Sequence, residues 1–367
     1  MVEYTAKPKV AAVQAASVWL DADATIDKSI AMIAQAAANG ADLIAFPETH
    51  VPGYPWWIWL GTPFWGAQFV GRFHENSLTV DGKRMLRLRE AAKKNKITVV
   101  MGYSERGGAS LYMSQVIIGP DGELIGNRRK LKPTHVERSV FGEGDGSDLV
   151  VFDRPFGRMG CLNCWEHYQT LTKFAMYSQH EQIHVSSWPS QSLYQPSVRT
   201  FGLKVNESAM RMYAVEGQLF VVNSSNLVDQ LCLDTFCDTP EKRQLIELGG
   251  GWARFFGPDG GDLAEPLPHT EEGILYADLD LRQIPLAKAA ADPVGHYARS
   301  DVLSLRFNRS KTSPVEHVGG APSMAAAATA TEGKERNSQR SLDSTLLAPE
   351  ASVDSEVLKG DGRGLRN

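Results

Sequence analysis

Short apolar runs, many of them rich in Val and Ile, recur along this chain and alternate with stretches of helical periodicity. Several of these runs are apolar throughout, which is typical of strands buried on both faces of a sheet. We predict strands at residues 10–14, 42–46, 97–102, 115–118, 160–163, 182–186, 219–223, 252–256 and 274–278. A chain with this pattern builds its core from sheet with helices packed against it.

Helical stretches lie between some of these runs. Residues 24–39 place Ile26, Ile30 and Ile33 on one stripe, and Gly40 follows as a stop signal. We also predict helices at residues 84–95, 171–178 and 208–216.

The tetrapeptide GPDG occurs twice, at 119–122 and 257–260, each time between predicted strands. Pro followed by Asp-Gly suits a tight turn, so both copies predict hairpins. Because early strands alternate with helices while later ones include hairpins, we predict the α/β class, with a mixed sheet covered by helices.

Charge and hydropathy exclude several partners. The formal net charge of −5 over 367 residues offers no basic stripe for nucleic acid and no attraction to anionic membranes. No stretch approaches about 18 consecutive apolar residues, and the N-terminus shows no secretory signal pattern. We therefore expect no nucleic-acid partner and no membrane span, and the four cysteines then suit the reducing cytoplasm.

The composition changes near residue 310. From residue 311 to the end there is no Phe, Tyr or Trp, and Ala-, Ser- and Gly-rich stretches take over. Such a segment buries too little apolar surface to offset the entropy of ordering it. We predict one domain at 1–310 and a largely disordered, low-complexity tail at 311–367.

The segment GCLNCWEHYQ at 160–169 holds Cys161 and Cys164. A zinc site would need Cys232 and Cys237 as further ligands, yet their spacing is loose, and strand positions 161 and 164 face opposite ways. A redox pair needs the cysteines at a helix N-terminus, whereas here a strand runs into them. We favour no metal, Cys161 as buried packing, and Cys164 as a nucleophile at a strand end, where catalytic groups of α/β sheets collect.

A cysteine nucleophile needs a base or a nearby cation, because its reference pKa of about 8.5 leaves little thiolate at neutral pH. Glu48 follows the apolar run at 42–46 and a proline. Poor solvation there would raise its pKa and suit a general base; the alternative is an exposed loop carboxylate. The run RRKLK at 128–132 offers cations, with a solvated basic loop as the alternative.

Three stretches, FPE with PGYP, then RRKLKPTHVER, then NCWEH, resemble the motifs of the nitrilase branch of the carbon–nitrogen hydrolase superfamily. The resemblance runs from about residue 9 to 308 and includes DPVGHYARSDVL at 292–303. It implies that Glu48 is the general base, Lys130 the catalytic lysine, Cys164 the nucleophile and Glu137 a second glutamate near the lysine.

The same resemblance implies a four-layer α-β-β-α sandwich that dimerises through helices and extends into spiral filaments. It also implies hydrolysis of a nitrile by two waters to a carboxylic acid and ammonia, through a covalent thioimidate and a thioester on the cysteine. No cofactor is needed, because the carbon does not change its oxidation state and the cysteine supplies the nucleophile.

Aromatic residues are concentrated at 52–66, where they line either a substrate pocket or a subunit interface. Tyr54 follows the predicted base closely, and Trp188 ends another predicted strand, so both are expected to line the pocket. We expect the backbone N–H of Trp165 to stabilise charge on the substrate nitrogen. His135 and His167 lie near the motifs, and we expect minor positioning roles for both.

Two other functions are compatible with the same residues. An amidase or a cyanide-processing enzyme would use the same Glu, Lys and Cys groups. With a simple nitrile as substrate, a nitrilase gives acid and ammonia, whereas a hydratase-like outcome gives the amide. A catalytically inactive scaffold would form filaments and no covalent adduct with a nitrile.

Overall fold

The computed structural model describes residues 3–313, together with residues 315 and 318. The chain up to Thr312 forms one compact unit. The tail predicted at 311–367 lies almost entirely outside the described residues, so the domain division at residue 310 stays a prediction. None of the helices in the described part combines the length and the hydropathy that a bilayer-spanning segment requires.

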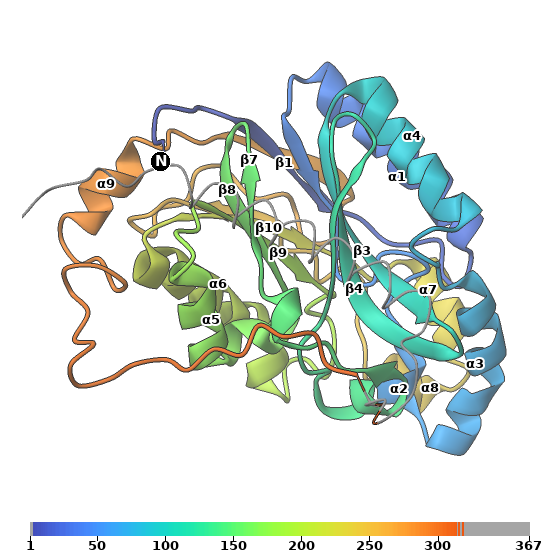
Figure 1. Ribbon diagram of the computed structural model, residues 1–367. Helices are drawn as coiled ribbons and strands as arrows, with labels where there is room; N and C mark the ends of the chain where they lie inside the picture. Colours follow the sequence, from blue (N-terminus) through green and yellow to red (C-terminus); the bar gives the residue numbers. More distant parts are fainter. Residues whose placement is uncertain (1–2, 314, 316–317, 319–367) are drawn as a thin grey trace, which may run out of the picture. The chain divides into compact units, whose positions relative to one another are not determined.

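The strands of the described residues form one connected sheet system (Figure 1). They are β1 Lys9–Gln14, β2 Leu43–Ala45, β3 Thr98–Gly107, β4 Ser110–Ile118, β5 Leu124–Arg129, β6 Phe141–Gly142, β7 Val151–Arg154, β8 Gly157–Asn163, β9 Ile183–Trp188, β10 Phe220–Ser225, β11 Arg254–Phe256 and β12 Gly273–Asp278.

The α-helices are α1 Ala22–Ala38, α2 Trp57–Leu60, α3 Pro63–Asn76, α4 Lys83–Asn95, α5 Thr170–Tyr177, α6 Leu203–Gly217, α7 Gln230–Phe236, α8 Pro240–Arg243 and α9 Gln283–Lys288. Short 3₁₀ turns are η1 His135–Ser139, η2 Gly146–Asp148, η3 Cys164–Tyr168 and η4 Arg199–Phe201.

All nine predicted strands and all four predicted helices are confirmed, with small changes of boundary. Two further strands, β5 and the short β7, were not predicted. The sequence of β5, LIGNRR, carries a glycine and three polar residues. Helix α3 was also not predicted, because aromatic residues and two glycines weaken its helical signal. Burial against neighbouring elements outweighs these local preferences.

The two GPDG turns differ. The first joins β4 to β5 as an antiparallel hairpin, as predicted. After the second, the chain forms only an isolated bridge between Phe256 and Asp262, and β12 pairs with β1 instead. The second predicted hairpin between strands is therefore wrong.

The sheet system consists of two halves. One half runs in the order β5-β4-β3-β2-β1, and the other continues as β10-β9-β8-β7. Strand β1 pairs along its length with β2 and β12, and its pairing with β10 is confined to Gln14 and Ser225. The two halves are thus free to fold face to face.

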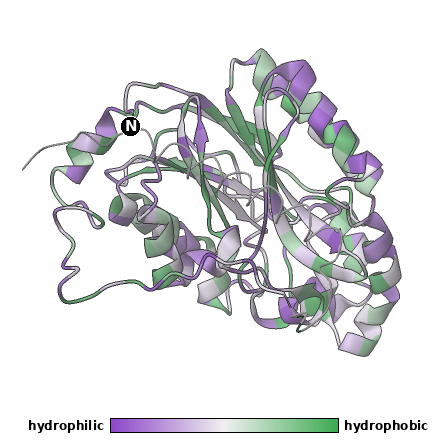
Figure 2. Cartoon of the chain, in the orientation of Figure 1, coloured by the Kyte–Doolittle hydropathy of each residue, from purple (hydrophilic) through white to green (hydrophobic). Residues whose placement is uncertain are grey.

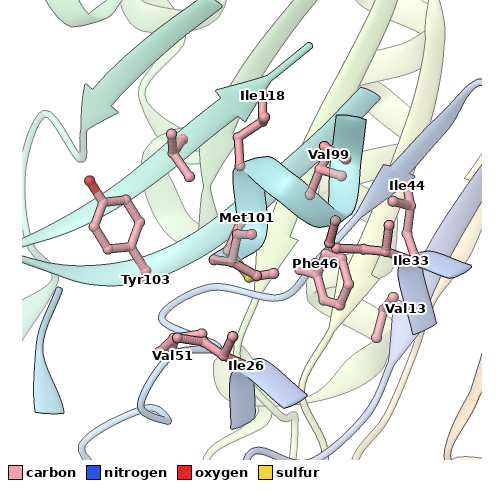
Figure 3. Packing of buried hydrophobic residues seen from close by; sticks show 14 of the residues in the cluster. Val13, Ile26, Ile33, Ile44, Phe46, Val51, Val99, Met101, Tyr103 and Ile118 are labelled. Carbon is pink, nitrogen blue, oxygen red and sulfur yellow. The ribbon is translucent and has the colours of Figure 1, made fainter. Parts of the chain in front are cut away.

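Three apolar layers show that they do so. Ile26 and Ile33 of α1, with Leu88 of α4, pack on side chains of β1–β4 such as Val99 and Met101 (Figure 3). A second layer joins the two half-sheets, and its members include Val10, Leu43, Val100, Ile117, Met159, Cys161, Ile183 and Phe220.

The third layer places α5 and α6 on the outer face of the second half-sheet, where Met176 and Met210 meet Leu162 and Val221. In Figure 1 the pair α1 and α4 and the pair α5 and α6 lie on opposite sides of the strands. Figure 2 shows the matching pattern, with hydrophobic residues on the central strands and both kinds alternating along α1 and α4. The four-layer α-β-β-α sandwich is confirmed.

Candidate active site

Three strand ends supply the polar residues of the site. Glu48 lies three residues beyond β2, Lys130 directly follows β5, and Cys164 directly follows β8. The first two strands belong to one half-sheet and β8 belongs to the other. The site therefore spans the two halves of the sandwich.

Lys130 lies between two carboxylates. Its Nζ donates to Glu48 Oε1 at 2.9 Å and to Glu137 Oε2 at 2.7 Å. Its remaining contact is the Met113 sulfur at 3.9 Å, a weak acceptor. All three charged side chains are buried, so their charges are poorly screened by water.

Burial and neighbouring charge act in opposite directions on Lys130. Burial alone lowers its pKa, but the carboxylates of Glu137 and Glu48 outweigh burial and raise it. The ammonium therefore stays charged, and the alternative of a solvated basic loop is wrong for this residue.

The hydrogen-bonding capacity of the Glu48 carboxylate is only partly satisfied. Its Oε1 accepts from Lys130, while its Oε2 is buried with no hydrogen-bond partner. Burial raises the pKa of Glu48 to about 8, since the raising effects of burial and of the Glu137 charge exceed the lowering effect of Lys130. The poorly solvated setting predicted for Glu48 is confirmed, and the exposed-loop alternative is wrong.

The backbone around Glu48 is packed closely against β3. A side chain at Gly102 would come within 2.0 Å of the Pro47 carbonyl oxygen and 3.1 Å of the Glu48 Cα. Only glycine lets the two segments approach this closely. Thr49, the next residue, has a φ of 48°, so the chain turns sharply just after the carboxylate.

Cys164 begins the turn η3 with a φ of 45°. Burial raises the pKa of its thiol well above the ordinary value, and the Glu48 carboxylate raises it further. The Lys130 ammonium and the backbone N–H of Trp165 act in the opposite direction. These interactions bring Cys164 into the same electrostatic cluster as Glu48 and Lys130, and they leave it as a thiol that needs a proton acceptor.

The two cysteines of this segment lie in different layers. Cys161 packs between the half-sheets, whereas Cys164 packs with residues of α5 and α6. Cys232 and Cys237 are free and belong to a third cluster. The four cysteines, all within the described residues, are therefore free and do not form pairs. Within residues 3–313, no group of three or more His, Cys, Asp or Glu side chains is placed to hold a metal ion.

Glu137 is fixed by the aromatic segment and by its own turn. The Tyr54 hydroxyl donates to Glu137 Oε1 at 2.7 Å, and the Trp59 indole N–H donates to the Tyr54 oxygen at 3.0 Å. The backbone N–H of Thr134 donates to Oε2 of the same carboxylate. With Lys130, these contacts hold the Glu137 carboxylate in one orientation.

A cavity of about 40 Å³ is lined in part by Cys164. Its aromatic and apolar lining comprises Tyr54, Trp56, Trp59, Trp165, Trp188, Pro189, Leu193 and Phe201. Its polar lining comprises Thr134, Glu137, Cys164, Ser190, Gln191 and Asn206. The cavity thus combines a largely aromatic wall with a few polar groups near the thiol, as small-molecule sites do.

The predicted pocket residues divide into two groups. Tyr54, Trp165 and Trp188 line the cavity. His135, predicted to lie near the substrate, is exposed and outside the lining, and its ring stacks on Trp59 at a centroid distance of 5.5 Å. It supports the cavity wall from behind.

The aromatic segment at 52–66 serves more than one purpose. Trp56 and Trp59 line the cavity, Trp57 packs in the core, and Phe64 is 91% exposed. The sequence analysis did not single out Phe201, Gln191 or Asn206. Gln191 lies three residues beyond strand β9, a signal that could have been used, whereas Asn206 inside α6 gives no such signal.

A second buried ion pair lies beside the first cluster. Arg128 donates through both terminal nitrogens to Glu166, at 2.9 and 2.6 Å. Glu166 also accepts from the backbone N–H of Leu131 at 2.7 Å and from that of Asn163 at 2.7 Å. Since Leu131 follows the lysine and Asn163 precedes the cysteine, this pair fixes the separation of Lys130 and Cys164.

The family model described as "Carbon-nitrogen hydrolase" matches residues 9–289. The carbon–nitrogen hydrolase from Helicobacter pylori G27 has the same fold, with a TM-score of 0.65 and 17% identity over 80% of this chain and 96% of that one. The chain belongs to the carbon–nitrogen hydrolase family.

More similar relatives define its place in that family. An aliphatic nitrilase of Rhodococcus rhodochrous is 60% identical over 316 residues, covering 86% of each chain. The arylacetone-specific nitrilase of Alcaligenes faecalis is 45% identical over 310 residues, covering 84% of this chain and 87% of that protein. Within the family, these similarities place the chain in the nitrilase branch.

Proposed function

We propose that this chain hydrolyses organic nitriles to the carboxylic acid and ammonia, with Cys164 as the nucleophile. The observation that carries the proposal is the position of the thiol. It lines an aromatic cavity, and its pKa responds to the charges of Glu48 and of a lysine held between two carboxylates. The similarity to proteins named nitrilases supports the same reaction.

In the first step Glu48 takes the thiol proton and the Cys164 sulfur attacks the nitrile carbon. The carbon–nitrogen triple bond becomes a double bond, and negative charge develops on nitrogen. The Lys130 ammonium and the Trp165 backbone N–H stabilise this charge, and a proton transferred to nitrogen completes the covalent thioimidate.

In the second step a water that gives its proton to Glu48 adds to the thioimidate carbon. The resulting tetrahedral intermediate expels ammonia and leaves a thioester on Cys164. A second water hydrolyses the thioester, which releases the acid and restores the thiol. A solved structure of an amidase mutant from Nesterenkonia sp. AN1 carries the acetamide moiety of fluoroacetamide covalently on its active-site cysteine, so the cysteine of that protein acts as a nucleophile.

The cavity favours apolar nitriles. Six aromatic side chains line it, together with a few polar ones. An apolar substituent would lie against the rings while the nitrile group reaches the sulfur. Relatives named for aliphatic and for arylacetone-specific activity fit this range.

We place a subunit contact on helices α5 and α6. Their outer surface exposes Leu171 at 68% and Met212 at 47%, next to Val215 and Tyr168. Apolar groups grouped in this way are typical of interfaces, and a symmetric pair of such helices would build the dimer that extends into a filament. The four free, buried cysteines suit a reducing cytoplasm.

Replacement of the two neighbouring cysteines tests the mechanism. Cys164→Ala should abolish release of acid and ammonia, while Cys161→Ala should keep most activity because Cys161 packs between the sheets. Mass spectrometry after brief exposure to a nitrile should show an adduct on Cys164. Turnover by Cys164→Ala would overturn the mechanism, and amide as the main product from a nitrile would indicate a hydratase-like outcome.

A further inference from the structure

A row of buried polar groups starts at the backbone carbonyl of Cys164. His167 Nδ1 contacts the backbone carbonyl oxygen of Cys164, and its Nε2 lies 2.8 Å from His184 Nε2. His184 Nδ1 lies 2.7 Å from Glu181 Oε1, and the Tyr213 hydroxyl donates to Glu181 Oε2 at 2.8 Å. None of these four side chains lines the cavity.

The chemistry of the groups assigns the protons along this row. A carbonyl oxygen only accepts, so His167 Nδ1 carries the proton, and in a neutral ring its Nε2 must accept. His184 therefore donates from Nε2 and accepts at Nδ1. The only remaining donor for that nitrogen is Glu181 Oε1, which requires a protonated carboxyl group.

The surroundings agree with neutral groups throughout. The side chains of His184 and Glu181 are inaccessible to solvent, and His167 is almost so. Burial lowers the pKa of both histidines well below the ordinary value and raises the pKa of Glu181 to about 8. Every donor in the row from Tyr213 to Cys164 then points the same way, and hydrogen bonds aligned in this manner strengthen one another.

We infer that His167 is a positioning residue that aims the Trp165 backbone N–H at the reacting atoms, and that protonated Glu181, acting through His184, holds His167 in the required tautomer. The inference rests on the proposed role of Cys164. The Cys164–Trp165 peptide is trans, so its C=O and N–H point in opposite directions. When His167 holds the carbonyl, the N–H is directed toward the sulfur side.

This peptide needs such an anchor. The φ of 45° at Cys164 is a left-handed conformation, which is unfavourable for a residue with a side chain. The His167 ring is itself fixed, because it stacks on Trp188 at 5.6 Å with an interplanar angle of 15° and meets Tyr213 edge-on at 5.4 Å. An anchor with one ring orientation and one tautomer holds the peptide plane in one direction.

A matched pair of variants tests the positioning role. In His167→Asn the amide nitrogen takes the place of Nδ1 and still donates, whereas His167→Leu has a similar size and no donor. We expect His167→Leu to lower kcat by about 10- to 100-fold with little change in KM, somewhat less than the loss of a whole oxyanion-hole donor. His167→Asn should recover at least a tenfold part of that loss.

Equal kcat values for the two folded variants would overturn the inference, since His167 would then only fill space. Cys164→Ala separates the two proposals. If Cys164→Ala is inactive while the two His167 variants are equal, the nucleophile stands and the positioning role fails. If Cys164→Ala is active, the proposed function itself fails.

Infrared difference spectroscopy tests the proton assignment without relying on turnover. The carboxylic-acid C=O stretching band of Glu181 should appear at pH 7 in the wild-type minus Glu181→Gln spectrum. Gln keeps an N–H donor toward His184, so it is the conservative replacement. A carboxylate band in place of the acid band would overturn the assignment.

Discussion

The two buried ion clusters at the site contain the same kinds of group and differ in how completely those groups are paired. Glu166 accepts four hydrogen bonds, two from Arg128 and two from backbone N–H groups, and these bonds lower its pKa despite burial. Glu48 accepts one, has a buried oxygen without a partner, and its pKa is raised to about 8.

The difference separates a structural pair from a reactive group. A carboxylate with every lone pair satisfied has no capacity left for a substrate proton, and it serves to hold Asn163 and Leu131 in place. A carboxylate with a free oxygen and a pKa near neutrality exchanges protons readily. Incomplete pairing in the interior is usually unfavourable, and it is the property of Glu48 on which the proposed mechanism depends.

Replacement of Glu48 tests the difference between the two carboxylates most directly. Glu48→Gln should lower kcat by about 10²- to 10⁴-fold, because the amide keeps the contact to Lys130 and cannot accept a proton. Its free energy of unfolding should change little. Steady-state kinetics and denaturant unfolding on the same preparation check both halves. A variant with near-normal kcat would show that another group takes the thiol proton.

The opposite result is expected at the saturated pair. Glu166→Gln leaves the Arg128 charge buried without its partner, which should reduce the free energy of unfolding by about 3–5 kcal/mol. Glu143→Gln is the control, since Glu143 pairs with Lys132 at the surface and should contribute about 0–1 kcal/mol. Equal losses of unfolding free energy in the two variants would mean that the buried, fully hydrogen-bonded Arg128 pair contributes no more to stability than the surface pair.

Glu137 links the reactive cluster to its surroundings. Glu137→Gln should lower kcat by about 100-fold, because Lys130 loses one of the two carboxylates that hold it. Its negative charge also raises the pKa of Glu48. Its removal should therefore lower that pKa and shift the acid limb of the pH profile to lower pH. A limb that stays in place would reduce Glu137 to a structural role.

The pH dependence of the wild type gives the smallest effect. A base acts in its ionised form, and the pKa of Glu48 is raised to about 8. Accordingly, kcat/KM should rise about tenfold per pH unit below pH 8 and level off above it. A profile already flat at pH 6 would contradict this value and place Glu48 among the fully ionised carboxylates.

Much of the fold could be predicted from the sequence because buried strands and amphipathic helices leave strong local patterns. The strands that were missed are those whose burial depends on distant partners. In β5 the cations alternate: Arg128 faces buried Glu166, and Arg129 packs on the Tyr112 ring. The sequence shows only a run of charges and no sign of which are inside.

The site was predictable for a different reason. Glu48 and Cys164 each follow a predicted strand, so strand prediction and motif resemblance pointed to the same positions. Lys130 follows β5, which was not predicted, and only the motif resemblance pointed to it. The pairing of Arg128 with Glu166 was not predicted, since it joins two segments 38 residues apart. The fold determines which charged residues pair, and the local sequence does not indicate the partners.

The pairing of β1 with β10 at Gln14 and Ser225 alone has a consequence for inactivation. Glu48 and Lys130 follow strands of one half-sheet, and Cys164 follows a strand of the other. A small increase in the distance between the half-sheets would separate these groups long before either half-sheet unfolded. We therefore expect a destabilising change in the apolar layer between the half-sheets, far from the substrate, to abolish activity while most of the fold is retained.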